Sequence, residues 1–99
     1  MKNLLSEIRN FIHKRNWQQY HSPKNLAMAL TVETAELLEI YQWMSAEESD
    51  NVDPATLRHI EEEIGDIQIY LATIGDRYNI DPVEAAHKKL LKNEKKYPA

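Results

Sequence analysis

The sequence of 99 residues contains no cysteine, only two glycines and four prolines, and no long apolar run. The absence of cysteine excludes disulfides and thiolate metal sites, and it is compatible with a reducing compartment. So few glycines and prolines favour long helices over extensive loops. Because no apolar run approaches the roughly 18 residues that span a bilayer, and the first residues lack a signal-peptide pattern, we expect a cytoplasmic protein without a membrane partner.

The remaining composition is that of an ordinary globular protein, with 42% hydrophobic and 28% charged residues. A formal net charge of −4 argues against a nucleic-acid polymer as partner, although it does not exclude a phosphorylated small molecule. The length predicts a single domain over residues 1–99. A chain this short buries a modest share of its surface, so we expect its apolar helices to need a partner subunit.

The spacing of apolar residues predicts an all-α protein, because no strand-like alternation is present. Four helices are expected, at 3–19, 24–44, 54–77 and 82–95. The last three begin close to a proline, which suits the first turn of a helix: Pro23, Pro54 and Pro82. We interpret the polar, acidic segment 45–53 as an exposed loop.

Two of these helices carry carboxylates where apolar side chains are expected. On a helical wheel, Glu33 lies in the middle of the apolar stripe, and Glu36 lies about 60° to one side. Glu63 and Asp66 repeat this arrangement in the third helix. A carboxylate that leaves water is destabilising unless something compensates its charge. If the two helices pack antiparallel, four acids converge inside the protein.

Four converging acids can be protonated, paired with buried cations or bound to a metal. Only Arg77 and His59 flank the stripe of the third helix, near its ends. Oxygen ligands favour a hard cation such as Mg²⁺, with Mn²⁺ as a substitute. A redox bundle is disfavoured, since di-iron proteins place histidine three residues after glutamate and this chain has Glu36 and Asp66 there. Because Mg²⁺ is commonly completed by substrate phosphates, the acids indicate phosphate chemistry.

The last helix carries a basic face that has two interpretations. Its members recur at spacings of three and four: Lys89, Lys92, Asn93 and Lys96. They could hold a polyphosphate, or they could simply complement the dipole at a helix C-terminus.

Ring side chains form a further candidate group. We expect Trp17, Tyr20, His21 and Trp43 to cluster near the ends of the first two helices. A planar base could stack there, although core packing is an alternative role for each tryptophan.

The spacing Glu33-x-x-Glu36 followed by Glu63-x-x-Asp66 resembles the ExxE…ExxD motif of the MazG-like all-α nucleoside triphosphate pyrophosphohydrolases. The flanking segments 11–43 and 61–81 and the ending KKLLKNEKKYP resemble the dCTP pyrophosphatase branch of that family. The resemblance covers nearly the whole chain, with a middle loop shorter than in the longer relatives.

This resemblance implies a four-helix MazG-like bundle that assembles as a dimer or a dimer of dimers, with sites built across subunits. It implies hydrolysis of a nucleoside triphosphate, dCTP or a related deoxynucleotide, to the monophosphate and pyrophosphate, as in cleansing of the nucleotide pool. The implied Mg²⁺ ligands are Glu33, Glu36, Glu63 and Asp66. The implied base pocket contains Trp17, His21, Trp43 and Tyr70, and the residues near phosphate are Lys89, Asn93 and Lys96.

The sequence is compatible with more than one proton acceptor and with a second function. One of the four acids, or Glu39 one turn beyond Glu36, takes the proton in the proposed reaction, and sequence does not decide which. The alternative function is a non-catalytic helical interaction module, whose inward acids pair with basic residues of a partner.

Overall fold

The computed structural model describes residues 1–99, apart from the side chain of Lys2. Its elements are α1 (Lys2–Lys14), the 3-10 turn η1 (Gln18–Tyr20), α2 (Pro23–Tyr41), α3 (Ala46–Ser49), α4 (Pro54–Arg77) and α5 (Pro82–Lys96). The described residues contain no strand, so the all-α prediction is confirmed. None of these helices combines the length and the apolar character that a membrane span requires.

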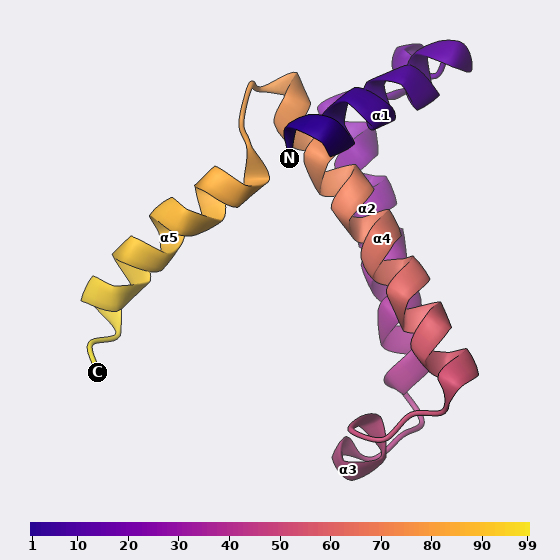
Figure 1. The fold of residues 1–99 in the computed structure, drawn as a ribbon, viewed down its shortest axis with the longest axis vertical. Helices are drawn as coiled ribbons and strands as arrows, with labels where there is room; N and C mark the ends of the chain where they lie inside the picture. The colour runs from indigo at the N-terminus through magenta and orange to yellow at the C-terminus, as the bar shows by residue number, and fades with distance from the viewer.

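The two longest helices, α2 and α4, lie side by side and antiparallel and form the centre of the molecule (Figure 1). Each begins where its cap predicts. The Ser22 side chain accepts a hydrogen bond from the backbone N–H of Asn25, and Asp53 accepts one from Thr56. A proline follows each cap in the first turn, where its missing N–H is not needed. The sequence therefore determines where this helix pair starts.

Helix α1 crosses the pair near the end of α4 (Figure 1). Ile8 is its buried residue, and the Arg9 guanidinium donates to the Asp76 carboxylate, with Nε 3.0 Å from Oδ2. The predicted extension of this helix to residue 19 is wrong, because α1 ends at Lys14. Asn16 has a φ of 53°, which is left-handed and cannot continue a right-handed helix.

The sequence predicted an exposed loop at 45–53. The structure differs, because this segment contains the short helix α3. The Ser45 hydroxyl accepts from the backbone N–H of Glu48, while the Glu48 carboxylate accepts from the backbone N–H of Ser45. This reciprocal capping box satisfies two backbone donors and stabilises the turn. A serine followed by glutamate three residues later is the signal that could have predicted it.

Helix α5 leaves the rest of the molecule after a turn at residues 78–81 (Figure 1). The radius of gyration is 16.2 Å, whereas a compact domain of 100 residues has about 13 Å. The apolar residues of the described chain that are buried are few: Ile8, Leu26 and Ala72. A single chain is therefore an open arrangement with a small core.

The turn between α4 and α5 generates a prediction about its glycine. The backbone N–H of Ile80 donates to the carbonyl oxygen of Gly75, and a Cβ at residue 75 would collide with the carbonyl oxygen of Ile80. We expect Gly75→Ala to lower the free energy of unfolding by about 1–3 kcal/mol. Gly65→Ala is the matched control, since nothing lies within 4 Å of its added Cβ, and alanine there should stabilise α4 by about 0.5–1 kcal/mol. Urea unfolding measures both, and equal effects would contradict the packing role of Gly75.

Candidate active site

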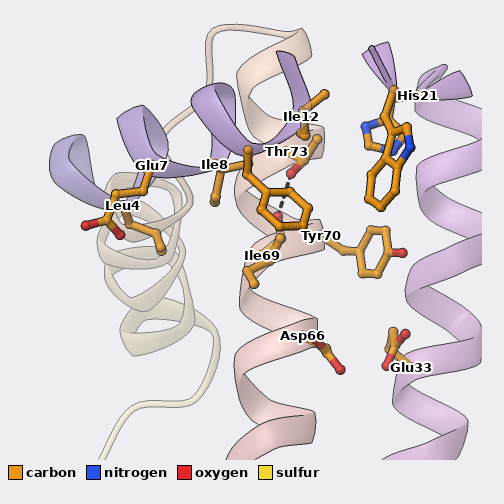
Figure 2. Close-up of a pocket in the computed structure, with 12 residues that line it drawn as sticks. Leu4, Glu7, Ile8, Ile12, His21, Glu33, Asp66, Ile69, Tyr70 and Thr73 are labelled. Carbon is orange, nitrogen blue, oxygen red and sulfur yellow. Dashed lines mark hydrogen bonds between the residues drawn. The ribbon is translucent and has the colours of Figure 1, made fainter. Parts of the chain in front are cut away.

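Helices α2 and α4 bring carboxylates together from opposite sides of their interface. One carboxylate oxygen from each of Glu33, Glu36 and Glu63 lies within 4.8 Å of the others. Asp66, one turn beyond Glu63, faces Glu33 across the helix pair (Figure 2). The antiparallel packing thus gathers acids that are 30 residues apart in the sequence, because each occupies the inward face of its helix.

Burial makes this cluster electrostatically unfavourable without a counter-charge. Glu63 is only 7% exposed, and Oε2 of both Glu33 and Glu63 is buried without a hydrogen-bond partner among the described atoms. Burial, followed by the charges of Glu36 and Asp66, raises the pKa of Glu33 to about 7. Burial and the charge of Glu36 also raise the pKa of Glu63. Orphaned carboxylate oxygens at such close range fit a hard divalent cation.

A cavity of about 390 Å³ extends from this cluster toward the N-terminal end of α2 (Figure 2). Glu33 and Asp66 line one end of it and His21 lines the other (Figure 2), and Trp17, four residues before His21 in the chain, also lines it. Tyr70 lies between these ends, and burial, followed by the charges of Glu33 and Asp66, raises the pKa of its hydroxyl (Figure 2). The remaining wall is largely apolar, with Leu4, Ile8, Phe11, Ile12 and Ile69.

Aromatic and cationic contacts hold the far end of the cavity in shape. The rings of Phe11 and Trp17 meet edge to face at a centroid distance of 5.6 Å, and the Arg15 guanidinium lies 3.7 Å from the Phe11 centroid. Arg77, at the end of α4, donates a hydrogen bond to the carbonyl oxygen of His21. The Nδ1 atom of His21 is buried without a partner, so it is available to a ligand in the cavity.

Trp43 does not join these residues. It follows α2 and is 88% exposed, whereas Trp17 and His21 precede the same helix. Because the 19 residues of α2 span about 28 Å, the predicted cluster that includes Trp43 is wrong within a single chain. Tyr20 is likewise exposed and does not line the cavity. Trp43 remains a candidate only for a site formed with another copy.

The predicted phosphate-binding residues also lie apart from the cavity of their own chain. Lys89, Asn93 and Lys96 are on α5, which diverges from α2 and α4 (Figure 1). None of them lines the cavity between Glu33 and Trp17. In one chain the structure therefore joins the acidic residues with Trp17, His21 and Tyr70, but not with the basic face.

A second hollow, the outer hollow, has a volume of about 510 Å³. It opens beside Glu36 and Glu63 and is also lined by Glu39 and His59. His59 Nε2 lies 3.5 Å from Glu63 Oε1. From the sequence, His59 was expected only to flank the apolar stripe of this helix. The histidine spacing considered there was that of di-iron proteins, three residues after a glutamate. The signal that finds this contact is the spacing of four residues before Glu63, which places both side chains on one helix face.

Comparison with known proteins finds a matching family and similar relatives. The sequence model of the MazG-like family matches residues 28–99. The chain is 37% identical over 90 residues to dCTP pyrophosphatase 1 of Bos taurus and 35% identical over 91 residues to the Homo sapiens protein of that name. These matches cover 89% and 90% of this chain but only 53% and 54% of the relatives. The chain thus spans about half the length of these two proteins.

A solved structure is similar over the whole chain. The crystal structure of a pyrophosphatase from Archaeoglobus fulgidus DSM 4304 matches with a TM-score of 0.88 and 44% sequence identity. The match covers 100% of this chain and 93% of that one. The open arrangement with a diverging α5 therefore agrees with a solved fold at high sequence identity.

The raised pKa of Glu33 predicts how stability depends on pH in the metal-free protein. Folding shifts this pKa from 4.5 to about 7, so the folded state binds the proton more tightly than the unfolded state does. Stability is then highest below pH 4.5 and falls as the pH rises through 7. We expect a higher Tm at pH 5 than at pH 8 in EDTA, and a smaller difference in Glu33→Gln. Calorimetry measures both, with the exposed Glu61→Gln as control, and an unchanged difference in Glu33→Gln would contradict repulsion within the cluster.

Proposed function

Because this chain belongs to the MazG-like family, we propose that it hydrolyses nucleoside triphosphates between the α- and β-phosphates, releasing the monophosphate and pyrophosphate. The observation that carries the proposal is one cavity that is lined by Glu33, which has a buried carboxylate oxygen without a partner, by Asp66, and by Trp17 and His21. The proposed substrate is dCTP or a related deoxynucleotide, which the names of the relatives support. Such an activity would serve to cleanse the nucleotide pool.

The acidic end would hold Mg²⁺, with Mn²⁺ as a substitute. The proposed ligands are Glu33, Glu36, Glu63 and Asp66. The close approach of the first three and the unpartnered oxygens of Glu33 and Glu63 support this role. Asp66 is included because it faces Glu33 across the helix pair (Figure 2). When bound, the ion neutralises the charge that develops on the leaving pyrophosphate. The donor set contains only oxygen atoms, which is the chemistry that Mg²⁺ requires.

The chain's own residues bind the substrate and move the proton. The base lies against Trp17, with the free Nδ1 of His21 as a hydrogen-bond partner. Tyr70 lies between base and acids and excludes water from the wall of the cavity. One of the four acids accepts the proton of the attacking water. Glu39, in the outer hollow, is the alternative base.

We also propose that the active form is a homo-oligomer, a dimer or a dimer of dimers. The chain exposes 8054 Å², whereas a compact monomer of its mass exposes about 5,800 Å². One face of α4 carries large apolar side chains at a spacing of seven, and Tyr78 continues the spacing directly after the helix. All four are exposed: Leu57, Ile64, Leu71 and Tyr78. Such a stripe is typical of a helix that packs against another helix.

Self-association would also give a role to the predicted site residues that do not line the cavity of their own chain. A second copy could supply Trp43 to the base, and Lys89, Asn93 and Lys96 to the phosphates. The described cavity lining contains no lysine or arginine, so a polyphosphate needs cations from outside it. We propose that α5 of a neighbouring copy provides them.

Incubation with Mg²⁺ and each common ribo- and deoxyribonucleoside triphosphate, with separation of the products, tests the function. We expect monophosphate and pyrophosphate, with dCTP among the good substrates. Glu63→Gln keeps the shape of the buried side chain but removes its charge, so we expect turnover to fall by about 100-fold or more while folding survives. Glu62→Gln, the exposed neighbour, should keep full activity. No turnover of any triphosphate by the wild-type protein would favour the interaction module instead.

Sedimentation tests the oligomer. Ile64→Glu places a charge in the middle of the exposed apolar stripe, so we expect it to shift the protein toward a monomer and to reduce turnover. Glu62→Gln, on the opposite side of α4, should leave the oligomer intact. A wild-type protein that sediments as a fully active monomer would overturn the shared-site proposal.

A further inference from the structure

His59 lies beside the carboxylate cluster, in the hollow that Glu36 and Glu63 also line, and it does not line the cavity that contains His21. It precedes Glu63 by one helical turn on α4, and its Nε2 is 3.5 Å from Glu63 Oε1. The Glu63 side chain is 9% exposed, whereas His59 is 56% exposed. His59 therefore has freedom to rotate, while Glu63 is held in place.

The separation of these two atoms suits a shared ion. Two ligand atoms that each lie about 2.1 Å from one metal ion are roughly 3.0–3.4 Å apart, depending on the angle between the bonds. The observed 3.5 Å needs only a small rotation of the exposed imidazole. The other oxygen of Glu63, Oε2, is buried without a partner, so it remains available to the proposed Mg²⁺ when Oε1 serves a second ion.

The outer hollow supplies further oxygen ligands. Glu36 and Glu39 line it from α2, opposite His59 and Glu63 on α4, and it also contains Gln42 and Thr56. Its lining has no lysine or arginine to offset the negative charge of the three glutamates. A cation attracted to this hollow meets one nitrogen and several oxygen donors.

We propose that His59 and Glu63, with oxygens of Glu36 and Glu39, form a second divalent-cation position that prefers a transition ion such as Mn²⁺ over Mg²⁺. Mg²⁺ takes oxygen ligands almost exclusively, whereas Mn²⁺ and later first-row ions accept imidazole nitrogen readily. The inference rests on the proposed carboxylate metal site but not on any reaction at it. A surface ion pair between His59 and Glu63 would give no such preference.

Metal titration of the stripped protein, without nucleotide, tests the proposal. We expect calorimetry to find a Mn²⁺ site in the wild type that His59→Ala weakens by at least about tenfold, while the Mg²⁺ isotherm stays unchanged. His87→Ala, an exposed histidine on α5, is the matched control and should change neither isotherm. Equal weakening of both ions, or an unchanged Mn²⁺ isotherm, would overturn the proposal.

Pulsed electron paramagnetic resonance of wild-type protein loaded with Mn²⁺ provides a measurement that does not depend on a variant. We expect a nitrogen coupling from directly bound imidazole, and its absence would refute the His59 ligand. If triphosphates are not hydrolysed but this coupling is present, only the proposed reaction fails. If hydrolysis occurs and the coupling is missing, only the second cation position fails.

Discussion

The repulsion between carboxylates across the α2–α4 pair is the constraint on which the rest of this structure depends. These helices would form an ordinary apolar interface if Glu33 and Glu63 were aliphatic. Instead, oxygens of Glu33, Glu36 and Glu63 lie within 4.8 Å of one another, and two buried oxygens lack partners. Removing acids from water without compensation is destabilising, so the folded chain keeps a local conflict that a cation would relieve.

That conflict also bears on the openness of the chain. Acids occupy the middle of the largest helix interface, which leaves few apolar residues there to build a core, and Leu26 and Ala72 are among the few that are buried. Much of the remaining apolar surface faces outward, including the stripe of Leu57, Ile64 and Leu71. Burial of that surface against another copy would stabilise the fold without disturbing the acids. The acids in the α2–α4 interface and the exposed apolar surface of α4 are thus two consequences of one helix arrangement.

Local sequence signals predict this fold well where one physical rule dominates. Proline and cap residues determine where α2, α4 and α5 begin, and helical periodicity predicts that the acids face inward. The end of α1 was missed because Asn16 is left-handed, and an asparagine in the sequence does not by itself indicate this conformation. The separation of Trp43 from Trp17 follows from the length of α2, so the sequence could have predicted it. The direction of α5 depends instead on how helices are arranged in space. No periodicity within one helix carries that information.

The cavity itself indicates where the missing positive charge must come from. A nucleoside triphosphate brings several negative charges, yet the lining contributes Glu7, Glu33 and Asp66 and no lysine or arginine. A substrate in this cavity would therefore be repelled by a metal-free single chain, however well Trp17 and His21 receive its base. A divalent cation offsets the carboxylates, and the lysines of α5 can reach a cavity only in another copy if α5 keeps its diverging course (Figure 1). If the proposed function holds, metal binding and assembly would be linked conditions for binding the triphosphate, because each would supply charge that the other cannot.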